Sequence, residues 1–77
     1  MHLSKKAKML RTQVMNMLNM DDAALKRYLQ KECKHKEEIL ACIATLRNEA
    51  LDNKDEHAFN RMCWLYNAVK GIEVLCP

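Results

Sequence analysis

The chain has 77 residues, of which 49% are apolar and 30% charged, with a net charge of +3, one Gly and one Pro. This composition excludes a disordered or β-rich protein and predicts an all-α fold. The length allows a single helical domain over residues 1–77, whose small core leaves a narrow margin of stability that a partner or a second copy commonly remedies.

The first predicted element is an amphipathic helix over about residues 3–18. Its apolar residues are spaced by four and three positions, as one face of a helix requires. They are Leu3, Ala7, Leu10, Val14 and Met17. We therefore expect residues 1–20 to form an N-terminal helix or extension.

A basic cluster lies beside this apolar face. It consists of Lys5, Lys6, Lys8 and Arg11. Such a cluster can contact nucleic acid or an anionic membrane. We favour a solvated face, because no aromatic residues are interleaved and only four charges are present. Nucleic acid is not the expected partner.

The next predicted element is the first arm of a helical hairpin, residues 21–51. Asn19 or Asp21 can cap its start. The stretch 30–38 is almost entirely polar, but good helix formers dominate it, and Glu32 and Lys36 have the favourable i,i+4 order. We expect a continuous or kinked exposed helix there, followed by a segment that packs from Ile39 onward.

The hairpin should turn at residues 52–54. Asn53 and Glu56 have the spacing of a capping box, which places the start of the next helix there. So short a connection requires its two flanking helices to run antiparallel. The predicted arms are therefore residues 21–51 and 54–76.

The second arm has more apolar surface than a small hairpin can cover. One stripe has core-facing spacing and consists of Phe59, Met62, Tyr66, Val69, Ile72 and Cys76. A second stripe sets one large ring beside two small residues and consists of Trp64, Ala68 and Gly71. Residues 62–66 are apolar throughout, and a helix that is apolar all round is normally buried. The N-terminal segment, a second copy or a different protein can supply the cover.

These observations predict a partner-binding surface on the second arm. A helix with two apolar stripes can pack its own hairpin with one and a partner with the other. Buried aromatic residues dominate interface energetics, so Trp64 is the expected central anchor. The predicted contact residues are Met62, Trp64, Leu65, Ala68 and Gly71.

Four cysteines are present, and no signal-peptide pattern opens the sequence. We therefore expect reduced thiols and a cytosolic location, with Cys42 and Cys63 buried as small hydrophobes. The residue types of a zinc site occur without its usual paired spacing, in Cys33, His35, Cys42, His57 and Cys63. We expect no metal and no cofactor.

Catalysis is not expected either. His57 and Cys63 are nearly two helical turns apart, which is too far for a direct hydrogen bond along one helix. A helical hairpin of this size also lacks a deep cleft. No apolar run approaches the roughly 20 residues that span a bilayer.

Three segments carry a family resemblance: Leu25-Lys-Arg-Tyr-Leu29, Ile39-Leu-Ala-Cys-Ile-Ala-Thr-Leu-Arg47 and Ala68-Val-Lys-Gly-Ile-Glu-Val-Leu75. Over about residues 25–76 the sequence resembles the small helical-hairpin co-chaperones of type III secretion needle subunits. The resemblance implies a non-enzymatic protein that joins a larger helical-repeat chaperone. The pair would hold the needle subunit monomeric in the bacterial cytoplasm before export.

Two other functions remain open on the residues. One is a small homodimeric regulatory protein, such as a mobile element encodes, that acts on a host protein or on nucleic acid through its basic N-terminus. The other is a structural subunit of a coiled-coil assembly. Because residues 62–66 surround their helix with apolar groups, we expect the isolated chain to self-associate and to exchange that contact for a different partner when one is present.

Overall fold

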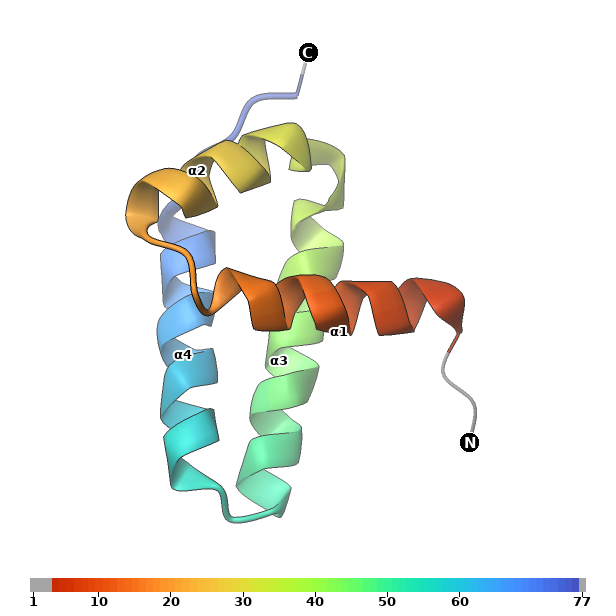
Figure 1. The fold of residues 1–77 in the computed structure, drawn as a ribbon, viewed down its shortest axis with the longest axis vertical. Coiled ribbons are helices and arrows are strands. Elements are labelled where there is room, and N and C mark those ends of the chain that lie inside the picture. The colour runs from red at the N-terminus through yellow and green to blue at the C-terminus, as the bar shows by residue number, and fades with distance from the viewer. Residues whose placement is uncertain (1–3, 77) are drawn as a thin grey trace.

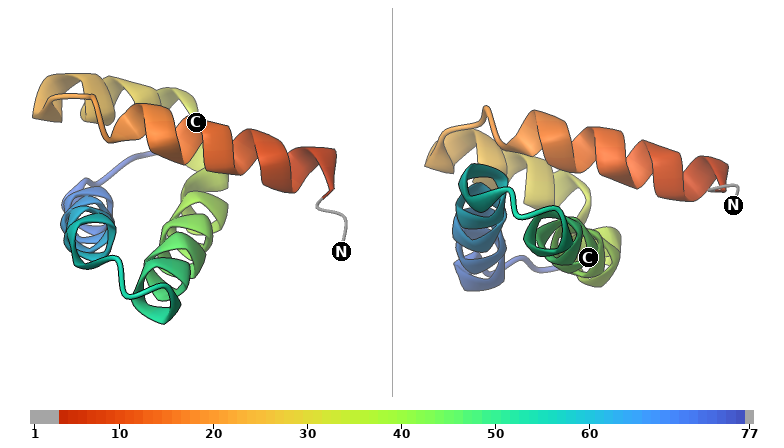
Figure 2. Two further views of the ribbon diagram at one scale, coloured as in Figure 1. Left: turned by 60° about the horizontal axis from the view of Figure 1, so that its bottom comes forward. Right: turned by 90° about the horizontal axis from the view of Figure 1, so that it is seen from below.

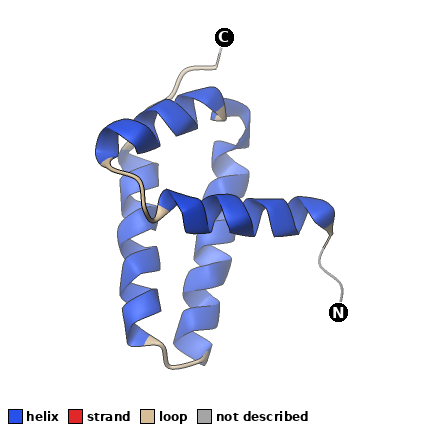
Figure 3. Cartoon of the chain, in the orientation of Figure 1, coloured by secondary structure: helices blue, strands red, loops and turns tan. Residues whose placement is uncertain are grey.

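The computed structural model describes residues 4–76, which contain four α-helices, one short 3-10 helix and no strand. Figure 3 shows this helical architecture. The predicted all-α class is confirmed. Leu3, which the sequence places at the start of the first apolar face, lies outside the described residues.

Helix α1 spans Lys5–Met17, close to the predicted range. The side chain of Ser4 caps it by accepting a hydrogen bond from the Ala7 N–H. Val14 and Met17 on its apolar face are buried in the core. Residues 4–20 are thus part of the domain rather than an appendage to it.

Helix α2 spans Asp22–Lys31, and Asp21 caps it through the Ala24 N–H. The predicted arm, residues 21–51, is not one continuous helix: of the continuous and the kinked alternatives, the continuous one is wrong, because the α-helix breaks after residue 31 and a 3-10 turn, Cys33–His35, follows. Glu32 adopts a non-helical conformation at the break. The break lets α2 cross the end of the hairpin and bury Leu25 and Leu29, which a straight arm would carry away from the core (Figure 1).

The hairpin consists of α3, Lys36–Asp52, and α4, Glu56–Gly71. Figure 1 shows the two helices side by side and antiparallel. The predicted turn position is confirmed, and Lys54 at the turn has a positive φ of 56°. The predicted Asn53 cap is wrong, because Asn53 ends α3 and the Asp55 side chain caps α4 by accepting from the Ala58 N–H. Asp55, two residues after Asn53, is the residue that the turn places beside the unpaired backbone N–H groups at the start of α4.

The second arm does not remain helical to residue 76, as the sequence predicted. Helix α4 ends at Gly71, a poor helix former, and residues 72–76 leave it as a segment without helix or strand. Lys36 Nζ donates a hydrogen bond to the Ile72 carbonyl just past the helix end. Cys76 therefore does not continue the apolar stripe of α4.

The helices form two layers, as Figure 2 shows, with α1 and α2 on one side and the hairpin on the other. Helix α1 crosses α3, and α2 covers the end of the hairpin where α4 finishes. Apolar side chains from all four helices form one core between the layers. Its members are Val14, Met17, Leu25, Leu29, Ile39, Leu40, Ile43, Met62, Leu65 and Val69.

Candidate protein-binding surface

Helix α4 divides the predicted contact residues between its two sides. Met62 and Leu65 are only 5% and 0% exposed and belong to the core. These two side chains are therefore not on the surface that the sequence predicted for them, because they join the core to which all four helices contribute. Within residues 62–66, Cys63 and Tyr66 are half-buried and Trp64 is exposed.

Trp64 lies on the other side of α4 and is 49% exposed. Ala68, one turn later on the same face, is half-buried, and Gly71 is exposed. No atom lies within 4 Å of the position that a Cβ on Gly71 would occupy. The second predicted stripe thus presents an indole and two small residues with open space beside Gly71.

A surface hollow of about 740 Å³ adjoins this stripe, and we call it the α2–α4 hollow. Its lining combines apolar and charged residues of α2, α4 and the C-terminal segment. They are Asp22, Lys26, Asn67, Ala68, Gly71, Ile72 and Glu73. Sequence reasoning found Ala68 and Gly71 but missed the α2 residues, since only the break after residue 31 brings α2 over the end of α4.

Large exposed apolar side chains elsewhere do not gather on one element. Met9 and Met15 lie on α1, Leu51 lies near the hairpin tip and Leu75 lies in the C-terminal segment. Single apolar side chains on a surface are ordinary. Among residues 4–76, Trp64 differs from them as the one large aromatic side chain that is about half exposed, and it lies one helical turn before Ala68, which lines the α2–α4 hollow.

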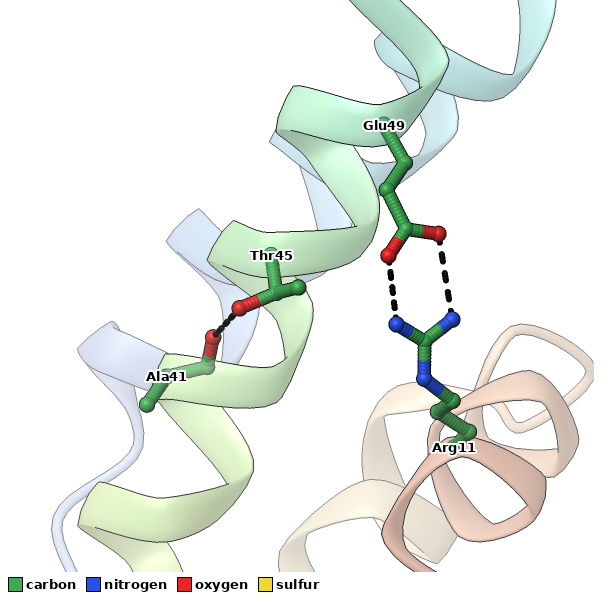
Figure 4. Close-up of polar contacts among 4 residues, drawn as sticks. All are labelled: Arg11, Ala41, Thr45 and Glu49. Carbon is green, nitrogen blue, oxygen red and sulfur yellow. Dashed lines mark hydrogen bonds and ion pairs between the residues drawn. The ribbon is translucent and has the colours of Figure 1, made fainter. Parts of the chain in front are cut away.

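The basic cluster of α1 is partly used inside the molecule. The Arg11 guanidinium forms two hydrogen bonds with the Glu49 carboxylate of α3 (Figure 4). Lys6 Nζ lies 3.0 Å from a carboxylate oxygen of Glu38. Hydrogen bonds from these cations lower the pKa of both carboxyls, and the Arg11 pKa is raised in return. These ion pairs favour the predicted solvated, structural role over a phosphate-binding one.

Beside this ion pair, Figure 4 also shows an internal contact of α3, in which the Thr45 hydroxyl donates to the Ala41 carbonyl. Such back-bonding satisfies the hydroxyl within its own helix. Thr45 and Ala41 help to line a shallow hollow between α1 and α3, together with Cys42. Burial raises the pKa of the Cys42 thiol, so it stays protonated near neutral pH rather than forming a nucleophilic thiolate.

The expectation of four reduced thiols is wrong for one pair. Cys33 and Cys76 form a disulfide with 5.6 Å between their Cα atoms, although 43 positions separate them in the sequence. Such proximity follows from the path of the C-terminal segment and has no local sequence signal. Cys42 and Cys63 are free, as predicted, but half-buried rather than buried. Within residues 4–76, no three His, Cys, Asp or Glu side chains are grouped to hold a metal ion.

Among the side chains of residues 4–76, one buried polar atom lacks a hydrogen-bond partner. The Tyr28 hydroxyl of α2 makes no hydrogen bond with residues 4–76. Burial raises the Tyr28 pKa, with a smaller contribution from the nearby Glu32 carboxylate. The ring packs against the core. Tyr28 is therefore a structural residue whose hydroxyl contributes little to the fold.

None of the helices in the described residues combines the length and apolar character needed to cross a bilayer. Comparison with known proteins finds no matching family model, no similar curated protein and no similar solved structure.

Proposed function

We propose that this chain is a non-enzymatic helical binding protein whose docking surface is Trp64 and the adjoining α2–α4 hollow. The main support for this function is the exposed indole of Trp64. A half-exposed tryptophan beside two small residues leaves room for an apolar helix to seat against α4, and buried tryptophans dominate interface energetics. The charged groups of Asp22, Lys26 and Glu73 around the hollow would then orient the bound helix.

The specific role we propose is that of a co-chaperone in the bacterial cytoplasm. It would join a larger helical-repeat chaperone and hold a type III secretion needle subunit monomeric. The hairpin of α3 and α4, preceded by the short helix α2, supports this role because the resembled family pairs a short helical piece with a helical hairpin. We expect the free protein to self-associate through Trp64 and to exchange this contact for the partner.

The homodimeric regulator that acts through a basic N-terminus has less support. Arg11 and Lys6 are engaged by carboxylates of α3. Only Lys5 and Lys8 remain as cations of the cluster for which no ion pair is seen within residues 4–76. Two surface lysines would give only a small salt dependence of nucleic-acid binding.

The proposal predicts that Trp64→Ala weakens association by about 2 kcal/mol or more, roughly a 30-fold rise in Kd. The probe is the needle subunit together with the helical-repeat chaperone from the genome that encodes this chain, titrated by calorimetry. Helicity and thermal stability should change little, because the indole is already half exposed. Met9→Ala is the matched control, since Met9 is 61% exposed but lies on α1.

Two results would overturn the proposal. One is a Trp64→Ala variant that binds as tightly as the Met9→Ala control. The other is a needle subunit that polymerises equally fast with and without this chain and its chaperone. Light scattering of the free protein at rising concentration checks the expected self-association, which the same substitution should abolish.

A further inference from the structure

The C-terminal segment, residues 72–76, lies against the body of the molecule without regular secondary structure. Ile72 and Val74 pack against the hydrophobic core. Leu75 is 84% exposed, so the end of the segment gains little from burial. The apolar packing that holds the segment in place therefore comes from only two half-buried side chains, Ile72 and Val74.

Polar contacts add only a little to this attachment. Gln30 Nε2 of α2 donates to the Leu75 carbonyl at 2.7 Å, and Lys36 Nζ of α3 donates to the Ile72 carbonyl. Both donors sit on flexible side chains at the surface or partly buried, where a hydrogen bond contributes little net free energy. The covalent link from Cys76 to Cys33 is the one contact that does not exchange with water.

The same segment forms part of the docking surface. Ile72 and Glu73 line the α2–α4 hollow together with Asp22 and Lys26 of α2. The disulfide joins the end of this segment to Cys33, in the turn that follows α2. Neither cysteine lines the hollow itself, but the disulfide links the segment that carries Ile72 and Glu73 to the turn directly after α2, the helix that supplies Asp22 and Lys26.

We propose that the Cys33–Cys76 disulfide is a redox-operated clasp that fixes residues 72–76 on the core and thereby sets the shape of the α2–α4 hollow. The effect on partner binding rests on the function proposed above, whereas the clasp itself does not. Closed, it holds Ile72 and Glu73 in place. Open, it frees the segment and exposes the core surface beneath Ile72 and Val74.

Opening proceeds by thiol–disulfide exchange with a dithiol reductant. One reductant thiolate attacks the Cys76 sulfur, since Cys76 is exposed and Cys33 half-buried. The Cys33–Cys76 bond breaks, Cys33 leaves as a thiolate and takes up a proton, and a mixed disulfide forms at Cys76. The second thiol of the same reductant molecule then attacks the reductant sulfur that is bonded to Cys76. This closes the reductant's disulfide and releases Cys76 as a thiol. The protein gains two electrons and two protons, and the reductant becomes a cyclic disulfide.

The first test counts thiols and measures mobility in the full chain. Alkylation in denaturant should label two cysteines after mild oxidation, Cys42 and Cys63, and four after reduction. Backbone ¹⁵N order parameters of residues 73–76 should fall from about 0.85, typical of rigid backbone, to below about 0.6 on reduction. Ile43 in the core should keep its value. In Cys33→Ser, three cysteines should be labelled and residues 73–76 should be mobile under both conditions. Cys63→Ser, the matched control, should keep the mobility response, with one labelled cysteine after oxidation and three after reduction.

The second test measures binding of the needle subunit and its chaperone to the oxidised and reduced protein. We expect Kd to differ at least tenfold between the two forms and to be insensitive to reductant in Cys33→Ser. Order parameters that are the same in both redox forms, or four alkylated cysteines after oxidation, would overturn the clasp. A mobile segment with unchanged Kd would overturn its control of the hollow. Failure of Trp64→Ala to affect binding would instead count against the docking surface alone.

Discussion

Arg11 and Glu49 show how a single pair of side chains joins α1 to α3. Their side chains are 29% and 46% exposed, so solvent screens the attraction and we expect a contribution of at most about 1 kcal/mol. The two parallel hydrogen bonds of this bidentate pair add geometric specificity to the contact between α1 and α3, beyond their small contribution to the free energy of unfolding. The pair also makes stability depend on pH in a direction that can be worked out.

The Arg11 hydrogen bonds hold the Glu49 pKa below its ordinary value of 4.5. The unfolded chain loses this partner and binds more protons between the two values, so stability rises with pH there. The contribution of the pair is fully present above pH 4.5 and is lost as pH falls through the lowered pKa. Glu49→Gln should therefore reduce the free energy of unfolding by about 0.5–1 kcal/mol at neutral pH and by almost nothing in strong acid.

Urea unfolding of both proteins across this pH range provides the measurement. Glu73→Gln is a suitable control, because Glu73 is exposed and no ion pair is seen for it within residues 4–76. A loss from Glu49→Gln that persists unchanged in strong acid would show that the ion pair is not its cause.

Tyr28 offers a second test on one side chain. Its hydroxyl is buried without a hydrogen bond in residues 4–76, and an unsatisfied buried donor is unfavourable. Tyr28→Phe keeps the ring that packs on the core and removes the hydroxyl. We expect the free energy of unfolding to stay equal or rise by up to about 1 kcal/mol. A clear loss of stability in thermal unfolding would mean that the hydroxyl has a partner in solution.

At the scale of elements, the hairpin turn places two candidate caps within three residues. Asp55 accepts from the Ala58 N–H and caps α4, whereas no side-chain hydrogen bond is seen for Asn53 within residues 4–76. Loss of an N-cap costs about 1 kcal/mol. Asp55→Ala should therefore lower the free energy of unfolding by about 1 kcal/mol, and Asn53→Ala by much less. Urea unfolding measures the free energy of unfolding of both variants. If both lose the same amount, Asp55 alone is not the cap and Asn53 contributes as the sequence predicted.

Periodicity predicted the helices well where one face meets the core. The range of α1 and the position of the turn were visible in spacing and local chemistry, and Asp21 was one of the two caps that the sequence offered for α2. The break after residue 31 was not visible, because residues 30–38 are good helix formers by propensity. Tertiary packing decided that position, since a bend is needed to bury Leu25 and Leu29.

At the scale of the whole molecule, the sequence predicted only part of the candidate surface. It placed Trp64, Ala68 and Gly71 on one stripe, and the structure leaves Trp64 and Gly71 exposed, while Ala68 is half-buried and packs against the core. It could not show that Met62 and Leu65 are buried in a core shared by all four helices, because the direction in which a helix crosses its neighbours is not encoded in spacing alone. For the same reason, the approach of Cys76 to Cys33 emerged only with the full path of the chain.

The disulfide should contribute a large share of the stability of so small a domain. It closes a loop across a sequence separation of 43, which in the chain-entropy model restricts the unfolded state by about 4 kcal/mol. Cys33→Ser should therefore lower the free energy of unfolding of the oxidised protein by about 2–4 kcal/mol. The denaturant slope should also increase, because the unfolded chain then exposes more surface.

Urea unfolding with and without a dithiol reductant separates the covalent link from the side chain itself. Reductant should destabilise the wild-type chain by the same amount as Cys33→Ser and should leave the variant unchanged. Trp64→Ala should lose as much stability on reduction as the wild type. The indole is half exposed and takes no part in the disulfide that reduction breaks. A wild-type chain equally stable with and without reductant would mean that Cys33 and Cys76 are not joined in solution.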